Sequence, residues 1–533
     1  MWLVISQLPM SQLLGNVPLF ERQISRQVLR IQLPTAGPVE YNDRKNQVLQ
    51  IARAFRRPGT FRRRQAADED LARRRLHSVR LGAGERLKKK IYLVQPTYRA
   101  SSGRLLQGKN VFVHSCAIPA LAAATPSDWE REVCLEFFDD VNYDTDASVV
   151  GISSMGYDIL HGREIAAEFR RRGKVVIFGG YQAYFSRCRL LGVADSIVYG
   201  HPGPMQMARL LGDVETGSLA PEYDVGVDVN FPFDYSMLIG RRIGFMPILA
   251  SVGCRNRCEF CCAAARYDGQ YRLRRLRHVL ADLRGLRRHT RHFGFVDSNI
   301  YNNRGYLLAL CSAISREQLD IDWGAEATID IGEDAEVLRA LRNTGCRILF
   351  IGLETTNQHS LDSVHKPFTA QGYDRAMANI HHHRIAVAGY FLVGLDGDTR
   401  ETFDEMFDFI RRTRVNVPII NILLPAPGTA AFDRLDREGR LFVHSEDEFL
   451  PNALSYGISC SYCFYRPARM TADEVVEHLL RLRRRLGSLG EMVRRSTVRN
   501  PGVAASLFLM NLEFRRESRR MEYAARKQFP TGT

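Results

Sequence analysis

From residue 91 onward, short apolar runs alternate with amphipathic segments of helix length. Apolar runs of four to seven residues indicate buried strands, whereas apolar residues every three or four positions indicate helices. Strands alternating with helices predict a doubly wound parallel sheet over residues 91–215. Its expected strands are Ile91–Gln95, Val133–Phe138, Ser148–Ser153, Val175–Phe178 and Ser196–Tyr199, with helices at Ile118–Ala124 and His161–Arg172.

A second α/β region is expected over residues 245–440, after a linker at 216–244. Successive strand–helix units curl a parallel sheet toward a barrel, and six units give an open, partial one. Residues 441–533 are expected to form a mostly helical cap. The six barrel strands are expected at Met246–Val252, His292–Val296, Ile321–Ala325, Arg347–Leu353, Ile385–Val393 and Pro418–Leu424.

Residues 1–90 carry no sustained apolar period. They hold 19 Lys and Arg against 7 Asp and Glu, so most of the net charge of +15 belongs to this segment. Such a composition predicts a basic, disordered extension. The rest of the chain is close to neutral, so the charge does not indicate a nucleic-acid enzyme, and no nucleic-acid partner is expected.

Cysteine content and hydropathy indicate the cellular compartment of the protein. The 11 cysteines suit a reducing compartment, and they indicate metal binding rather than disulfides. No stretch approaches 18 uninterrupted apolar residues, so no membrane span is expected. We therefore expect a cytoplasmic protein.

Three cysteines follow the apolar run at the start of the second region. Cys254, Cys258 and Cys261 have the spacing C-x3-C-x2-C. Thiolates hold iron–sulfur clusters, usually four at a time, so three could hold a 4Fe–4S cluster and leave one iron open. The alternatives are a zinc site or three unrelated buried thiols. Zinc would need a fourth ligand nearby, and none is well placed.

With Phe260 directly before the last cysteine, this loop resembles the cluster loop of radical SAM enzymes. The resemblance implies that the open iron binds the amino and carboxylate groups of S-adenosylmethionine (SAM). One electron from the cluster would then cleave SAM to a 5′-deoxyadenosyl radical. It also implies an electron donor of the flavodoxin or ferredoxin type.

Polar residues and glycines fall at the carboxyl ends of the predicted barrel strands, where barrel enzymes place their chemistry. By resemblance, Asp297 and Glu354 are candidates to hydrogen-bond the amino group or ribose of SAM, and Phe260, Asn299 and Gly394 are further candidate SAM contacts. A carboxylate is the acceptor that an ammonium group requires. Either acid could instead cap the helix that follows it.

In the first region, ligands are expected beyond the carboxyl ends of the strands. The layout resembles the cobalamin-binding domain that precedes the barrel in one radical SAM branch. A D-x-H-x-x-G motif, whose His ligates cobalt in many cobalamin domains, is absent between Phe138 and Ser148. A degenerate domain is the alternative. The candidate cobalamin contacts are Ser153, Ser154, Gly179, Gly180, Tyr181 and Gly200.

The resemblance implies a cobalamin-dependent radical SAM enzyme, most simply a methyltransferase. The expected target is an unactivated carbon, or phosphorus, of a small-molecule, lipid or natural-product substrate. An oxidative cyclase or rearrangement enzyme without methyl transfer is the alternative. A non-catalytic iron–sulfur sensor or binding protein is a more remote one. Transfer-RNA methylthiolation is disfavoured, because Cys116, Cys134 and Cys188 are too irregularly spaced to form a second triad.

Overall fold

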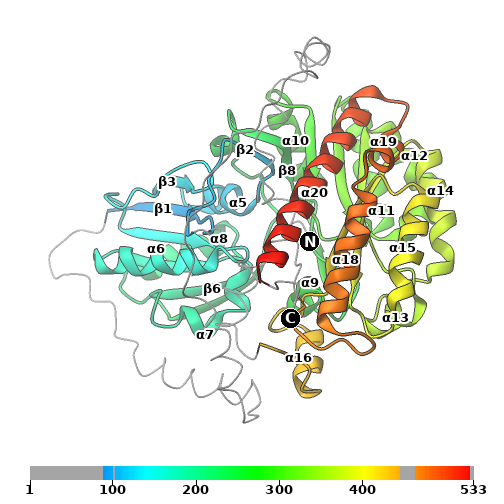
Figure 1. Ribbon diagram of the computed structural model, residues 1–533. Coiled ribbons are helices and arrows are strands. Elements are labelled where there is room, and N and C mark those ends of the chain that lie inside the picture. The colour runs from blue at the N-terminus through cyan, green and yellow to red at the C-terminus, as the bar shows by residue number, and fades with distance from the viewer. Residues whose placement is uncertain (1–87, 100–102, 444–462, 529–533) are drawn as a thin grey trace, which may run out of the picture.

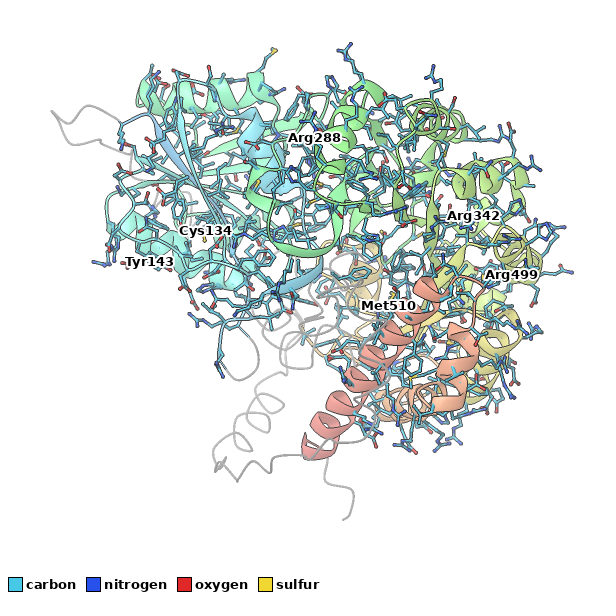
Figure 2. The ribbon with its side chains drawn as sticks, turned by 90° about the horizontal axis from the view of Figure 1, so that it is seen from above. Cys134, Tyr143, Arg288, Arg342, Arg499 and Met510 are labelled. Carbon is cyan, nitrogen blue, oxygen red and sulfur yellow. The ribbon has the colours of Figure 1, made fainter. Side chains whose placement is uncertain are left out.

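The computed structural model describes residues 88–99, 103–443 and 463–528. The disordered extension expected at residues 1–90 lies almost wholly outside the described residues. The chain forms two parallel sheets that lie side by side, and the C-terminal helix α20 (Pro501–Gln528) runs along the boundary between them (Figure 1). The view from above in Figure 2 shows the same two lobes, with Cys134 and Tyr143 in one and Arg342 in the other.

The N-terminal sheet has six parallel strands in the order β3-β1-β4-β5-β6-β7. Alternate residues of β1 face opposite sides. Ile91 and Leu93 share a core with helices α5 and α8, whereas Tyr92 and Val94 pack with α6. The strands are β1 (Lys90–Gln95), β3 (Glu130–Leu135), β4 (Val149–Ser153), β5 (Val175–Gly179), β6 (Ser196–His201) and β7 (Glu222–Val227), and the helices are α5 (Ala117–Ala124), α6 (Ile159–Arg171), α7 (Arg187–Leu190) and α8 (Pro204–Glu215).

The second sheet is the expected open barrel, and the prediction of a curled parallel sheet is confirmed. Its order is β15-β14-β13-β12-β11-β8-β2, with every pair parallel. The strands are β8 (Arg242–Ile248), β11 (His292–Phe295), β12 (Asp322–Ala327), β13 (Cys346–Glu354), β14 (Ala386–Val393), β15 (Val417–Ile422) and β2 (Asn110–Val113).

Three strands lie where the sequence pattern predicted none. Strand β2 lies within the N-terminal region but pairs with β8, so it adds a seventh strand to the barrel sheet. Strand β7 comes from residues expected to be linker, and it forms the edge of the N-terminal sheet. The third is β10 (Tyr271–Leu273), which pairs only with the short strand β9 (Ser251–Gly253). These strands are three to six residues long, and so short a strand gives little periodic signal to detect.

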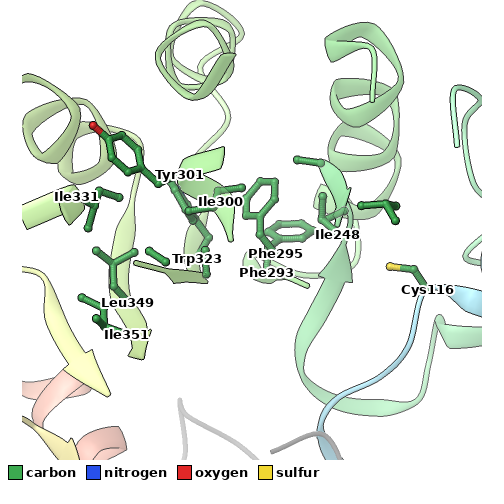
Figure 3. Packing of buried hydrophobic residues seen from close by; sticks show 14 of the residues in the cluster. Cys116, Ile248, Phe293, Phe295, Ile300, Tyr301, Trp323, Ile331, Leu349 and Ile351 are labelled. Atoms are coloured by element: carbon green, nitrogen blue, oxygen red, sulfur yellow. The ribbon is translucent and has the colours of Figure 1, made fainter. Parts of the chain in front are cut away.

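Helices cover the outer face of the barrel sheet. Figure 3 shows part of the core between these helices and the sheet, which includes Ile248, Phe293, Phe295, Trp323 and Leu349. Each of these side chains is essentially buried. The covering helices are α10 (Leu276–Arg287), α11 (Arg304–Arg316), α12 (Ala335–Asn343), α13 (Gln358–Ser363), α14 (Tyr373–His382), α15 (Arg400–Thr413) and α16 (Ala430–Arg437).

The inner face of the barrel is closed from one side by the C-terminal helices. Leu507 and Met510 of α20 share a core with Phe112 of β2, Phe350 of β13 and Tyr390 of β14. Helices α18 (Ala472–Leu486) and α19 (Leu489–Ser496) brace α20 from outside. Across the described part of the chain, no helix has both the length and the apolar character needed to span a membrane.

Candidate active site

The three-cysteine loop is closed at its base by a short antiparallel ribbon. Strands β9 (Ser251–Gly253) and β10 (Tyr271–Leu273) pair residue by residue. Gly253 has φ +87°, and a Cβ there would lie 2.3 Å from the Gln270 carbonyl oxygen. Only glycine fits this contact. The loop therefore leaves the barrel and returns to it at one fixed point.

The cysteines themselves lie at the inner end of this loop. Cys254 and Cys258 are buried, and half-buried Cys261 is the residue directly before helix α9 (Cys262–Tyr267). Burial raises the pKa of the Cys254 thiol, and it raises that of Cys258 to about 12. All three line one large cavity.

An iron–sulfur cluster and a single metal ion require different arrangements of ligands. In the described residues no three His, Cys, Asp or Glu side chains surround a common point as ligands of one ion. A cluster does not require that arrangement, because its thiolates bind different iron atoms.

Two polar networks that the sequence did not reveal hold the loop in place. Buried Asn302 accepts a hydrogen bond from the Arg255 backbone N–H (3.1 Å) and donates one to the Gly253 carbonyl (3.0 Å). Glu259, between Cys258 and Phe260, is buried and accepts from Arg434 Nε at 2.6 Å. These partners come from far along the chain, so no local pattern could have indicated them.

The network around Glu259 extends to the end of β14. Arg434 also pairs with Asp396 (2.8 Å), which in turn pairs with Arg440 (2.5 Å). Despite the burial of Asp396, these two guanidinium groups hold the pKa of its carboxyl group below the usual value. The cluster loop, the end of β14 and helix α16 are thereby tied into one charged unit.

Glu354 is a buried carboxylate with one oxygen in use. It ends β13 with φ +63°, and its Oε1 accepts from Lys366 Nζ at 2.7 Å. Its Oε2 is buried and has no partner, and the Oγ1 of cavity-lining Thr328 is in the same state. Because an unpaired buried acceptor is costly, both atoms are suited to a polar ligand in the cavity.

The other proposed SAM residues lie just behind the cavity wall. Asp297 Oδ2 accepts from the Ala250 backbone N–H (3.0 Å), and burial raises the pKa of this acid to about 6. Asn299 Oδ1 accepts from the Tyr301 N–H, in the manner of a helix cap. The Gly394 carbonyl accepts from Tyr465 Oη (2.6 Å). None of Asp297, Asn299 and Gly394 is among the lining residues of this cavity.

The cavity joins both halves of the described chain. Its volume is about 630 Å³, within the range of cofactor and ligand sites. From the barrel it is lined by the cluster cysteines, Phe260 and Glu354. From the N-terminal sheet it is lined by Ser153, Gly179, Gly180, Tyr181 and Gly200.

The N-terminal side of the cavity is built by close contacts between loops. Ser154 is not among the lining residues, and its Oγ donates to buried Asp158 (2.8 Å), which does line the cavity. A Cβ on Gly180 (φ +96°) would lie 2.2 Å from the Ser154 carbonyl oxygen, and one on Gly200 (φ +108°) would lie 2.1 Å from that of Gly226. These glycines thus permit neighbouring loops to approach each other, which accounts for them without a ligand.

The cluster helix α9 lies directly against the N-terminal sheet. His201 Nε2 and Tyr267 Oη are 2.8 Å apart, and the Arg266 guanidinium stacks 4.4 Å from the Tyr184 ring centre. Burial lowers the pKa of His201 to about 4, so the ring that pairs with this phenol is neutral. The two sides of the cavity are therefore fixed relative to each other by side-chain contacts.

Further lining residues were not singled out from the sequence. Glu326 of β12 is buried, burial raises its pKa to about 7, and its carboxylate lies 3.5 Å from Tyr390 Oη. An acid inside the apolar strand G-A-E-A was a detectable signal. Lys366, His114 and Tyr98 also line the cavity, and nothing in their local sequence marked them.

Comparison with known proteins identifies a radical SAM domain. Residues 248–410 match the model of the Radical SAM superfamily, so this segment is a radical SAM domain. The matched segment begins at the end of β8 and contains the three cysteines.

Curated relatives of this radical SAM protein extend beyond the matched segment. Bacteriochlorophyllide d C-12(1)-methyltransferase of Chlorobaculum tepidum is 26% identical over 76% of this chain and 89% of its own length. The C-8(2)-methyltransferase of the same organism is 27% identical over 63% of this chain and 79% of its own length. Hopanoid C-2 methylase of Rhodopseudomonas palustris is 30% identical over 37% of this chain and 38% of its own length.

A solved structure shares the fold of most of this chain. The radical SAM methyltransferase TsrM of Kitasatospora setae, determined with cobalamin and a [4Fe–4S] cluster, superimposes with a TM-score of 0.62. The match covers 81% of this chain and all of that chain at 16% identity. At this identity the likeness shows the fold alone.

Proposed function

We propose that this radical SAM protein is a cobalamin-dependent methyltransferase that acts on an unactivated carbon, or phosphorus, of a small-molecule, lipid or natural-product substrate. The observation that carries the proposal is the single cavity lined by the cluster loop and by the carboxyl ends of the N-terminal strands. Methyl transfer is favoured because the relatives that match most of this chain are named methyltransferases.

The residues present fit a 4Fe–4S cluster and SAM. Cys254, Cys258 and Cys261 supply three thiolates from one constrained loop, which suits a cluster with one open iron. The unpartnered Oε2 of Glu354 and Oγ1 of Thr328 would accept hydrogen bonds from the ammonium and hydroxyl groups of SAM. Asp297 and Asn299 would support the site from behind the wall, and Gly394 would shape its edge.

The N-terminal side fits a large cofactor such as cobalamin. Ligands of doubly wound sheets bind beyond the carboxyl ends of the strands, and the cavity opens at those ends of β1, β4, β5 and β6. We assign residues 91–215 to cobalamin binding, with Ser153, Gly179 and Tyr181 at the cavity surface. When bound, the cluster and SAM supply one-electron chemistry and a methyl group, and cobalamin supplies a carrier for that methyl group.

The contribution of the chain is to position these groups and to exclude water. Phe260, Tyr181 and Phe350 give the cavity apolar walls, and a dry cavity strengthens the polar contacts made inside it. Lys366 keeps Glu354 oriented through a buried ion pair. Reduction of the cluster would require a flavodoxin- or ferredoxin-type donor.

The proposal is tested by anaerobic reconstitution with iron, sulfide, cobalamin and SAM. Optical spectra report cluster and cobalamin binding. A strong reductant and the substrate classes named for the relatives, bacteriochlorophyllide d and a hopanoid, are then added. Formation of both 5′-deoxyadenosine and S-adenosylhomocysteine is the expected result.

The other outcomes of this assay each contradict part of the proposal. 5′-Deoxyadenosine alone would indicate cyclase or rearrangement chemistry, as named for an anaerobic magnesium-protoporphyrin cyclase of Rubrivivax gelatinosus that is 25% identical over 38% of this chain. Failure to bind cobalamin would remove the methyl carrier. Failure to assemble a cluster would overturn the enzyme assignment.

A further inference from the structure

His114 lies where the two sheets meet. It directly follows β2, the edge strand of the barrel sheet, and it precedes helix α5 of the N-terminal layer. Its side chain lines the cavity and is only 7% exposed. In chain order it falls in the connection between β1 and α5, so it is at the carboxyl edge of the N-terminal sheet, where a ligand is expected.

The orientation of the imidazole is fixed from two directions. Its ring stacks on Phe138 with 5.8 Å between ring centres and 25° between planes, and the Arg241 guanidinium lies 5.2 Å from the Phe138 ring centre. His114 Nδ1 lies 3.4 Å from the Ser115 carbonyl oxygen, toward which it can donate. This tautomer leaves the lone pair on Nε2.

Within residues 88–99, 103–443 and 463–528, no hydrogen bond reaches this Nε2 atom. Burial lowers the pKa of His114 to about 4, so the ring is neutral at physiological pH. Neutral imidazole nitrogen is the commonest protein ligand for metals. A ligating histidine also usually donates its other ring N–H to a carbonyl or carboxylate, which is the arrangement at Ser115.

The other histidines near the crevice are already engaged. His201 Nε2 pairs with Tyr267 Oη. His161 uses both ring nitrogens, with Glu136 at 2.8 Å and Glu164 at 2.8 Å, and it does not line the cavity. Of the two cavity-lining imidazoles in the described chain, His114 is therefore the one whose Nε2 makes no hydrogen bond, whereas in His201 only Nδ1 is without one.

We propose that His114 Nε2 is the axial protein ligand to the cobalt of bound cobalamin. The proposal rests on the proposed function, since it requires that cofactor. It explains how a chain without a D-x-H-x-x-G motif can present an imidazole to the cavity: the histidine comes from the end of a barrel strand. It also couples the cofactor directly to β2, and through β2 to the strand that leads into the cluster loop.

Electron paramagnetic resonance of the reconstituted cob(II)alamin holoprotein tests the assignment without turnover. A nitrogen bound axially to cobalt splits each cobalt line, as a triplet for ¹⁴N and a doublet for ¹⁵N. In protein labelled with ¹⁵N only at histidine, we expect doublets. Triplets that persist under this label would place the cofactor's own base on cobalt, and the absence of nitrogen splitting would mean that no nitrogen binds. Either result overturns the proposal.

Variants separate ligation from folding. His114→Gln should lose the histidine splitting while cobalamin stays bound, and His201→Gln, which removes the other cavity imidazole, should keep it. In His114→Gly, added free imidazole should restore a nitrogen triplet. Splitting that survives in His114→Gln contradicts the proposal. Wild-type protein that retains no cobalamin would overturn the proposed function itself, which distinguishes the two failures.

Discussion

The two sides of the cavity are built by different means. The side proposed to hold the cluster is a contiguous loop whose three cysteines lie within eight residues of sequence, closed at Gly253 and held by hydrogen bonds of Asn302 and Glu259. The N-terminal side is assembled from the ends of several strands and owes its shape to loops packed against each other at Gly180 and Gly200. Side-chain chemistry therefore defines one side, and backbone packing defines the other.

The largest effect is expected from loss of a cysteine. Cys258→Ser should abolish cluster assembly completely, because three ligands become two, while cobalamin binding persists on the other side. Cys262→Ser, a change at the neighbouring residue, is the matched control and should assemble the cluster normally. Iron and sulfide analysis with optical spectra measures both. A full cluster in Cys258→Ser would contradict the assigned ligand set.

The N-terminal side should fail through its backbone. Gly180→Ala places a Cβ against the Ser154 carbonyl at a positive φ, so we expect a loss of stability of about 1–3 kcal/mol and weakened cobalamin binding with the cluster retained. Gly173→Ala has a similar φ of +76° but no atom within 4 Å, so it isolates the backbone cost. Denaturant unfolding and cobalamin titration report the difference. Equal behaviour of the two variants would rule out the loop contact as the cause.

A smaller effect is expected from the charged network under the cluster loop. Arg434→Met leaves buried Glu259 without its partner, which should cost about 1–3 kcal/mol and make the cluster more labile to chelators. Arg440→Met removes a partner of Asp396 but leaves the contact between Arg434 and Glu259 intact. This variant should therefore lose its cluster to chelators more slowly than Arg434→Met. Chelation kinetics compare the two. Identical rates of cluster loss in the two variants would show that the contact between Arg434 and Glu259 does not stabilise the cluster.

The smallest effect concerns pH on the N-terminal side. Although burial opposes it, hydrogen bonds and charges from Glu136 and Glu164 raise the pKa of His161 above its usual value. The stabilisation is therefore fully present below the usual histidine pKa and is lost as pH rises through the raised one. The stability difference between wild type and His161→Gln should shrink over that interval. A difference independent of pH would contradict a charged His161.

Sequence reasoning succeeded where the signal was local. Most barrel strands contain apolar runs, and the three cysteines are recognised by their spacing, although their role as cluster ligands stays a prediction. It missed β2, β7 and β10 because strands of three to six residues are too short to show a period. Lys366 and His114 gained their positions only through pairing of distant segments. The sequence showed the glycines at the carboxyl edge of the N-terminal sheet. It did not show why glycine is needed there, because Gly180 and Gly200 contact loops 26 residues away in sequence.

In the proposed enzyme, one cavity brings the cluster and cobalamin together. The most direct measurement is electron paramagnetic resonance of protein that holds both the reduced cluster and cob(II)alamin. If the two centres share the cavity, magnetic interaction between them should broaden both spectra relative to protein that holds either centre alone. A spectrum equal to the sum of the two separate ones would contradict the account.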